Sequence, residues 1–295
     1  HSKLPDTYLI AYDTNTDSLA LAKEEGVIQE TCSCINESFG NCDYIFLCAP
    51  VSYNDENLLT LKKYLSPDTV LTDVGSVKGN IHIAAKEIGI EGNFIGGHPM
   101  AGYQKSGFKY SKETLFKGAS MILVPENSLG IEILAPITEF FKSLGFSNIT
   151  ITDAETHDKN IAFTSQLAHI VSNAYVKSPS SLQRKGISAG SYKDLTRVAY
   201  LNENMWTELF LENKDNLIFE LDFLIEELKK YGTVEVDDDM CIICVVGDLR
   251  SENLGFETIA TEAMANIPIR MISYGGSNHN ISFLIKEEYK QAALK

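Results

Sequence analysis

Residues 1–152 alternate short apolar runs with segments of helical periodicity. The apolar runs predict strands at residues 8–12, 44–49, 70–74, 94–95 and 120–124. The segments between them predict helices at residues 17–25, 54–64, 77–88 and about 130–144. Strands that alternate with helices are typical of α/β domains with a parallel, doubly wound sheet. Ligands of such sheets bind beyond the carboxyl ends of the strands.

Residues 153–232 show long helical periodicity and no strand pattern. Their last helix has apolar positions on more than one face, at Leu217, Ile218, Phe219, Leu221, Phe223, Leu224, Ile225 and Leu228. A helix that is apolar on most sides is buried on most sides, and a domain of about 80 residues cannot easily bury it alone. We therefore predict an all-helical domain that forms a homodimer through this helix. The alternative is a large core within one chain.

A third pattern covers residues 233–295. After an acidic stretch that ends at Asp239, it predicts strands at residues 240–246, 269–273 and 281–285, and helices at residues 256–265 and from 287 onward. This β-α-β-β-α order predicts a small α+β module with a ferredoxin-like plan. We expect the chain to leave this module before its last strand.

Composition excludes two classes of partner. The net charge of −15 argues against nucleic acid, which requires a basic face. An acidic protein also needs a local cluster of cationic groups before it can bind an anionic substrate. No apolar run approaches the ~20 residues that span a bilayer, so we expect a cytoplasmic protein that does not bind membranes.

Six cysteines stand at positions 32, 34, 42, 48, 241 and 244. Neither Cys32-Ser-Cys34 nor Cys241-Ile-Ile-Cys244 has a second pair or a nearby histidine at zinc spacing. We therefore predict buried, reduced thiols and no metal site.

Asp13 ends the first predicted strand. An acid in this place can bind the ribose hydroxyls of NAD and would repel the phosphate of NADP. The alternative is an ordinary turn cap. The glycine-rich fingerprint expected about 20 residues before such an acid is absent. We therefore expect the chain to lack the first strand and the pyrophosphate loop.

Two further segments follow predicted strands and carry candidate chemistry. In Asp73-Val74-Gly75-Ser76-Val77-Lys78, the Ser76 hydroxyl either caps the next helix or lies near an anion or a reacting hydroxyl. In Gly96-Gly97-His98-Pro99, the glycines suggest a close approach of the backbone to a ligand. Pro99 would hold His98 on a stiff turn. A neutral His98 could take a proton from a substrate hydroxyl during hydride transfer; the alternative is a structural histidine.

The helical domain offers a polar helix face and a cation. Arg197 can bind both oxygens of a carboxylate, and Asp194 can orient the guanidinium group of Arg197. Trp206 lies further along the chain. The alternative is a surface ion pair. The polar face predicts a pocket lining, and it consists of Ser165, Gln166, His169, Ser172 and Asn173.

Together these segments resemble the prephenate dehydrogenase family. The matching stretches are Tyr12-Asp13, Phe46-Leu47-Cys48-Ala49-Pro50, Asp73-Val74-Gly75-Ser76-Val77-Lys78, Gly97-His98-Pro99-Met100-Ala101-Gly102, Ser165-Gln166-Leu167-Ala168-His169 and Asp194-Leu195-Thr196-Arg197. The resemblance implies a Rossmann-like domain, a helical dimerisation domain, and NAD-dependent oxidative decarboxylation of prephenate to 4-hydroxyphenylpyruvate in tyrosine biosynthesis.

The resemblance also implies roles for single residues. His98 accepts the proton of the ring hydroxyl, Ser76 orients that hydroxyl and Arg197 binds a carboxylate. Gln104 stands where the family often has glutamate. The remaining predicted contacts are His169, Gln104, Asp194 and Trp206 for the substrate, and Asp13, Ala49, Pro50, Asp73 and Gly75 for the cofactor.

The last module resembles ACT regulatory domains, and its sequence is most similar to those of aspartate kinases. The resemblance rests on Ile267-Pro268-Ile269-Arg270-Met271-Ile272-Ser273 and Asn280-Ile281-Ser282-Phe283. This implies an amino-acid effector, tyrosine first, near Gly255, Gly275 and Gly276. Two alternatives stay open, an arogenate dehydrogenase and a non-catalytic amino-acid sensor. The set of His98, Ser76, His169 and Arg197 disfavours the sensor.

Overall fold

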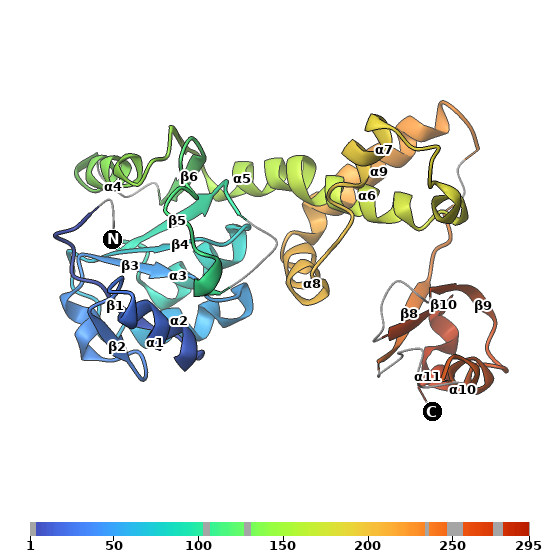
Figure 1. The fold of residues 1–295 in the computed structure, drawn as a ribbon, viewed down its shortest axis with the longest axis horizontal. Coiled ribbons are helices and arrows are strands. Elements are labelled where there is room, and N and C mark those ends of the chain that lie inside the picture. The colour runs from blue at the N-terminus through green and yellow to red at the C-terminus, as the bar shows by residue number, and fades with distance from the viewer. Residues whose placement is uncertain are drawn as a thin grey trace. The chain divides into compact units, whose positions relative to one another are not determined.

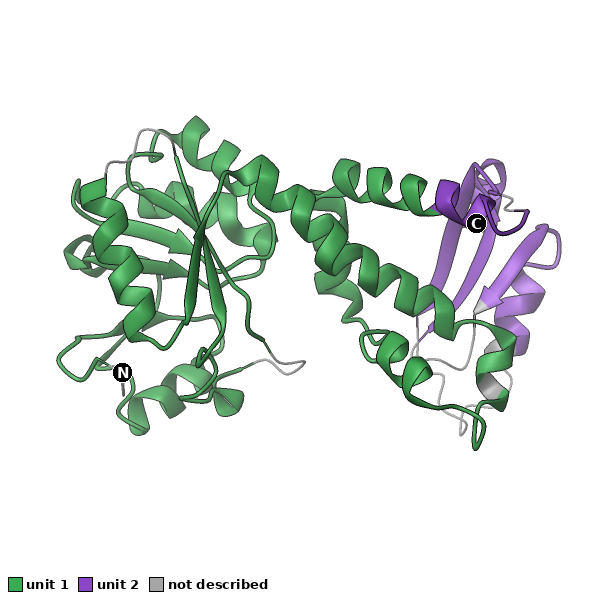
Figure 2. Ribbon diagram, turned by 90° about the horizontal axis from the view of Figure 1, so that it is seen from above, with its two compact units in different colours: residues 1–224 green, residues 225–295 purple. Residues whose placement is uncertain are grey.

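The computed structural model describes residues 4–102, 107–126, 131–233, 236–246, 256–273 and 280–294. The chain divides into two compact units, residues 1–224 and residues 225–295 (Figure 2).

The first unit begins with a two-stranded parallel sheet (Figure 1). Strand β1 (Ile10–Tyr12) pairs with β2 (Glu30–Cys32), and helix α1 (Thr16–Glu24) connects them. The Asn15 side chain accepts the Ser18 N–H and caps α1, as expected for an amide at this position. The sequence predicted β1 and α1 but missed β2, which is only three residues long.

A five-stranded sheet forms the centre of this unit. Its order is β3 (Tyr44–Leu47), β4 (Val70–Asp73), β5 (Phe94–Pro99), β6 (Ser120–Pro125) and β7 (Asn148–Ile151). Strands β3, β4 and β5 run parallel, and so do β6 and β7, whereas β5 and β6 are antiparallel. The predicted doubly wound sheet is thus confirmed as mostly parallel, with one antiparallel pair that the sequence did not predict.

Helices pack against both faces of this sheet. Helices α2 (Asn54–Leu61) and α3 (Gly79–Ile88) contribute Leu58, Leu61 and Ile81 to a core with Leu71 and Phe94. Helix α4 (Ile131–Ser143) contributes Ile137 and Phe141 to a second core with Ile95, Met121 and Leu123. Apolar side chains that alternate between two covered faces are what a doubly wound sheet requires.

The strand order leaves one place empty. In the doubly wound order, the strand that carries the glycine-rich turn lies between the positions that correspond to β1 and β3. Among the described residues no strand takes this place, and the β1–β2 pair is not hydrogen bonded to β3.

The rest of the first unit is helical, as predicted. A nearly continuous run consists of α5 (Ala154–Ile161), a π-helical turn (Ala162–Leu167) and α6 (Ala168–Val176). Helices α7 (Gly190–Thr196), α8 (Glu203–Glu212) and α9 (Lys214–Lys229) follow. Helix α9 buries Leu217, but Phe219 and Phe223 are 68% and 59% exposed. Among the described residues, these two aromatic side chains of α9 are therefore largely uncovered.

The second unit holds a three-stranded antiparallel sheet. Strand β10 (Asn280–Lys286) lies between β8 (Met240–Val246) and β9 (Ile269–Ser273). Helices α10 (Phe256–Ala263) and α11 (Lys290–Ala293) complete the predicted β-α-β-β-α order. Its core contains Ile243, Met264, Ile281, Phe283 and Ile285.

All six cysteines are unpaired. Only Cys32 is buried, and Cys34, Cys48 and Cys244 are exposed, so the prediction of buried thiols is wrong for these three. Within the described ranges, no helix has the length and apolar character needed to cross a bilayer. The same residues contain no group of three His, Cys, Asp or Glu side chains that could hold a metal ion.

Candidate active site

His98 lies on a strand and not on a turn. The segment Gly96–Pro99 belongs to β5, and His98 stands opposite Ile122 of antiparallel β6. The backbone partners offered by β6 outweigh the local turn preference of glycine and proline, so the predicted turn is wrong. Pro99 is the last residue of the strand, and the next N–H, that of Met100, donates to the carbonyl oxygen of Ser120 at 2.8 Å. His98 is 8% exposed.

The two glycines before His98 make room for buried polar groups. A Cβ atom on Gly96 would lie 2.6 Å from Nε2 of His82, and one on Gly97 would lie 2.4 Å from the carbonyl oxygen of Asp73. Both distances are shorter than any ordinary contact. Packing alone therefore requires glycine at both positions, and the approach of a ligand to their backbone stays a prediction.

A buried ion pair fixes the loop after β4. Lys78 Nζ contacts Oδ2 of Asp73, and the two side chains are 0% and 2% exposed. The Asp73 carboxylate also accepts the N–H of Gly75 at 2.8 Å and the N–H of Gly97 at 3.0 Å. Burial lowers the pKa of Lys78, and the charge of Asp73 opposes this effect. The Asp73 carboxylate makes its contacts inside the protein. A cofactor contact at Asp73 and Gly75 therefore stays a prediction, and the backbone of the loop would have to make that contact.

Ser76 does not cap the following helix. Helix α3 begins at Gly79 without a local side-chain cap. Instead, Asp158 of α5 accepts the N–H of Lys78 at 2.8 Å and the N–H of Gly79 at 2.7 Å. A carboxylate at a helix N-terminus satisfies free N–H groups and the helix dipole. Ser76 is half-buried, and its hydroxyl has no protein partner among the described residues.

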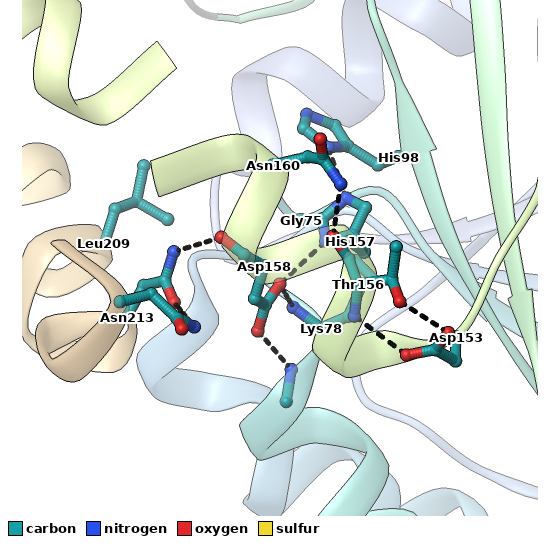
Figure 3. A network of polar contacts seen from close by, with 12 residues as sticks. Gly75, Lys78, His98, Asp153, Thr156, His157, Asp158, Asn160, Leu209 and Asn213 are labelled. Atoms are coloured by element: carbon teal, nitrogen blue, oxygen red, sulfur yellow. Dashed lines mark hydrogen bonds and ion pairs between the residues drawn. The ribbon is translucent and has the colours of Figure 1, made fainter. Parts of the chain in front are cut away.

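His98 belongs to a chain of buried polar groups (Figure 3). Its Nδ1 lies 2.9 Å from Nε2 of His157, and Nδ1 of His157 lies 2.7 Å from Oδ1 of Asp158. His157 and Asp158 are 2% and 5% exposed. The sequence did not predict this contact because it joins residues 59 positions apart.

The surroundings of His98 keep its ring neutral. Burial, with smaller effects of His157 and Lys78, lowers the pKa of His98 from 6.5 to about 3, against the opposing effect of Asp158. A neutral imidazole at physiological pH can accept a proton.

A second cluster surrounds His169 on α6. The His169 ring lies 4.0 Å from the Trp206 ring, between centroids. Its Nδ1 donates to the carbonyl oxygen of Val198 at 2.8 Å, which leaves Nε2 as an acceptor. Burial lowers the pKa of His169; the Val198 carbonyl opposes this effect and the charge of Arg197 adds to it. His169, Trp206 and Arg197 thus gather at one place.

Most of the polar face around His169 has a structural role. Gln166 Nε2 donates to the carbonyl oxygen of Leu209, Ser172 to that of Leu195, and Asn173 to that of Ala199. These bonds hold α8 against the π-helical turn, and α7 and the residues after it against α6. The predicted pocket lining is therefore wrong for these three side chains.

The remaining predicted residues fall into three groups. Arg197 and Asp194 are exposed, and no ion pair joins them in the part of the chain that the structure describes. Asp13, Ala49 and Pro50 are exposed just after β1 and β3, and Oδ1 of Asp13 accepts the N–H of Asn15 at 2.8 Å. Gln104 lies outside the described residues.

The comparisons with known proteins decide the family. Residues 1–150 match the family model described as prephenate dehydrogenase, nucleotide-binding domain. Residues 153–241 match the one described as prephenate dehydrogenase, dimerization domain. The chain belongs to the prephenate dehydrogenase family. Residues 243–295 match an ACT domain model. The family and the ACT module predicted from the sequence are thereby confirmed.

Relatives in the prephenate dehydrogenase family differ in the substrates that their names state. A cyclohexadienyl dehydrogenase of Zymomonas mobilis is 27% identical over 80% of this chain and 82% of that protein. The structure of a Synechocystis arogenate dehydrogenase is 28% identical with a TM-score of 0.67, over 76% of this chain and 81% of that one. The structure of A. aeolicus prephenate dehydrogenase in complex with hydroxyphenyl propionate and NAD+ is 30% identical with a TM-score of 0.69, over 77% and 82%.

Proposed function

We propose that this protein catalyses the NAD-dependent oxidative decarboxylation of prephenate. The observation that carries the proposal is the buried, neutral His98 at the carboxyl edge of the sheet, next to the loop of the half-buried Ser76. Support comes from the A. aeolicus relative, whose complex holds hydroxyphenyl propionate and NAD+.

The residues at the carboxyl edge fit part of a dinucleotide site. Asp13 is exposed after β1 and would bind the adenosine ribose, while Ala49 and Pro50 after β3 would line the cofactor. The glycine-rich turn for the pyrophosphate does not occur in the sequence. When bound, the nicotinamide ring supplies the hydride acceptor.

Proton removal and substrate binding are the roles of the protein's own residues. His98 takes the proton of the ring hydroxyl while the same carbon loses hydride, and Ser76 orients that hydroxyl. Arg197 binds a carboxylate, and His169 offers Nε2 to the substrate from the second cluster. Loss of carbon dioxide then makes the ring aromatic. We propose that His98, Ser76, His169 and Arg197 face one bound substrate, which a crystal structure with a product analogue would test.

Turnover by the full-length protein tests the function. We expect 4-hydroxyphenylpyruvate and NADH to appear from prephenate and NAD. Arogenate dehydrogenase is the second candidate, because the Synechocystis relative has a similar fold and identity. If kcat/KM is at least tenfold higher for arogenate than for prephenate, arogenate replaces prephenate as the proposed substrate. Failure with both substrates, together with binding of an amino acid, would favour the sensor.

Removing the guanidinium of Arg197 should mainly raise KM. Arg197→Ala deletes a carboxylate anchor that is present in both ground and transition states, so kcat should change little. Loss of a charged hydrogen-bond partner, about 2 to 4 kcal/mol, predicts a KM increase of roughly 30-fold to several hundredfold. The control is Lys193→Ala, which removes an exposed cation from the same segment. An unchanged KM in Arg197→Ala would remove this residue from the substrate site.

We also propose a homodimer formed through α9. Its exposed apolar side chains include Ile218, Phe219 and Phe223, and such a patch marks an interaction site. Phe219→Glu combined with Phe223→Glu should convert the dimer to a monomer at micromolar concentration in sedimentation. Asp222→Lys, at an exposed position of the same helix, should leave the dimer intact. A wild-type monomer at that concentration would refute the proposal.

An amino acid is the effector that we propose for the ACT module, with tyrosine as the first candidate. The predicted contacts near Gly255, Gly275 and Gly276 lie outside the described residues. Calorimetry with tyrosine, phenylalanine, lysine and threonine tests this proposal, and absence of heat with all four would contradict it.

A further inference from the structure

We propose that His157 and Asp158 are positioning residues that set the tautomer of His98. In this arrangement His98 carries its proton on Nδ1 and keeps Nε2 as its only proton acceptor. The tautomer does not depend on which substrate is bound, whereas its effect on turnover rests on the proposed function.

The argument begins at Asp158, whose carboxylate faces donors only. Its two oxygens accept the backbone N–H groups of Lys78 and Gly79 at 2.8 and 2.7 Å. A backbone N–H can only donate, so both oxygens act as acceptors. Oδ1 also contacts Nδ1 of His157 at 2.7 Å. His157 must therefore carry a proton on Nδ1 to make this bond.

The proton on His157 determines the one on His98. A neutral imidazole with a proton on Nδ1 has an acceptor at Nε2. Nε2 of His157 lies 2.9 Å from Nδ1 of His98, so Nδ1 of His98 must donate. His98 is then left with a lone pair on Nε2, which is the form that a general base requires. The opposite tautomer would present a donor to the substrate hydroxyl.

The same chain stabilises His98 after it takes the proton. The imidazolium that forms donates through Nδ1 to His157, and His157 in turn donates to Asp158. Besides these two groups, Lys78 is the charged side chain whose effect reaches His98, and its charge is balanced by Asp73. A histidine held by a carboxylate in this way follows the logic of the Ser-His-Asp triad, with a second histidine in between.

Asp158 is held in place from two sides. Its side chain caps α3, and its backbone carbonyl accepts Nδ2 of Asn213 at 2.8 Å (Figure 3). Asn213 Nδ2 also contacts Gln166 Oε1 at 2.9 Å, so the contact reaches the π-helical turn that follows α5. These bonds fix the carboxylate that orients His157.

The first test reads the tautomer directly. The protein is labelled with ¹⁵N-histidine, and the His98 signals are assigned as those lost in His98→Asn. At neutral pH we expect a protonated Nδ1 and an unprotonated Nε2 in the free protein, without cofactor or substrate. A protonated Nε2 in the wild-type protein would overturn the proposal.

The second test compares two replacements of His157. His157→Phe removes the acceptor, so His98 should populate both tautomers, and kcat should fall roughly tenfold to a hundredfold, the value of one hydrogen bond to a charged group. His157→Gln can keep an amide oxygen toward His98, so it should restore the Nδ1 proton and most of the lost kcat. KM should stay within about threefold in both variants, because neither change touches the substrate anchor at Arg197.

The matched control is His82→Gln, which changes another buried histidine, one that faces Glu126 at 2.7 Å and does not contact His157. It should leave the His98 tautomer unchanged. A folded His157→Phe with wild-type kcat and an unchanged His98 tautomer would overturn the proposal. If His157→Phe does not fold, the wild-type tautomer and the His157→Gln variant still decide the outcome. Failure of the proposed function would abolish turnover but not the tautomer signal, so the two failures are distinguishable.

Discussion

His98→Asn should lower kcat by roughly 100-fold or more, the usual contribution of a positioned base. The amide nitrogen of asparagine can keep the hydrogen bond to Nε2 of His157, which His98 makes through Nδ1 at 2.9 Å. The substitution therefore preserves the polar network and removes only the acceptor at Nε2. KM should change little because the substrate anchors remain. Steady-state kinetics on the full-length protein measures both quantities.

The stability of this variant should also depend differently on pH. Burial lowers the pKa of His98 from 6.5 to about 3, so the folded protein keeps the ring neutral where the unfolded chain binds a proton. The free energy of unfolding that His98 contributes is fully present above pH 6.5 and is lost as the pH falls toward 3. His98→Asn should lose less stability over this range, as measured by urea unfolding at several pH values.

Near-normal turnover of His98→Asn would show that the histidine is structural. The control is His82→Asn, which removes a buried histidine that interacts with Glu126. It should keep kcat within a fewfold of the wild-type value. Equal losses in the two variants would indicate damage to the fold and would contradict the role assigned to His98.

The sequence predicted the elements whose apolar pattern is strong and local. Strands β3, β4 and β6 and helices α1 to α4 occur where periodicity placed them. Strand β7 escaped prediction because Asn148–Ile151 is short and mostly exposed. Strand β5 was predicted too short, since Gly96, Gly97 and Pro99 favour a turn in isolation. Its true length depends on pairing with β6, a partner that local preference cannot reveal.

The candidate site was predicted in part, for a related reason. Motifs next to strand ends identified Ser76 and His98, because the parallel sheet brings such ends to one edge. His157 and Asp158 were missed because this part of the sequence showed only helical periodicity, and both residues lie inside a helix, α5. Their role becomes visible only when α5 lies against β5 and the start of α3. A helix cap supplied by another element carries no local sequence pattern.

Lys78→Met should destabilise the protein by about 3 to 5 kcal/mol, the usual cost of removing one partner of a buried ion pair. Methionine fills much of the same volume, so the loss arises from charge and not from a cavity. Asp73 is 2% exposed, and without Lys78 its carboxylate keeps only the N–H groups of Gly75 and Gly97. Two backbone donors cannot replace an ammonium group at this depth.

Thermal unfolding should show this loss as a Tm decrease of roughly 6 to 20 °C, on the scale of about 2 to 4 °C per kcal/mol for a domain of this size. Lys86→Met, on the helix α3 that directly follows Lys78, is the matched control because Lys86 is exposed. Its effect should stay within about 0.5 kcal/mol. Adding Asp73→Asn to Lys78→Met should recover part of the loss, since the unpaired charge disappears, but not all of it, because an amide offers one acceptor to the two backbone donors. If Lys78→Met lowers the free energy of unfolding by less than about 1 kcal/mol, water or a bound proton compensates the negative charge of Asp73. The loop that carries Ser76 would then not depend on this ion pair.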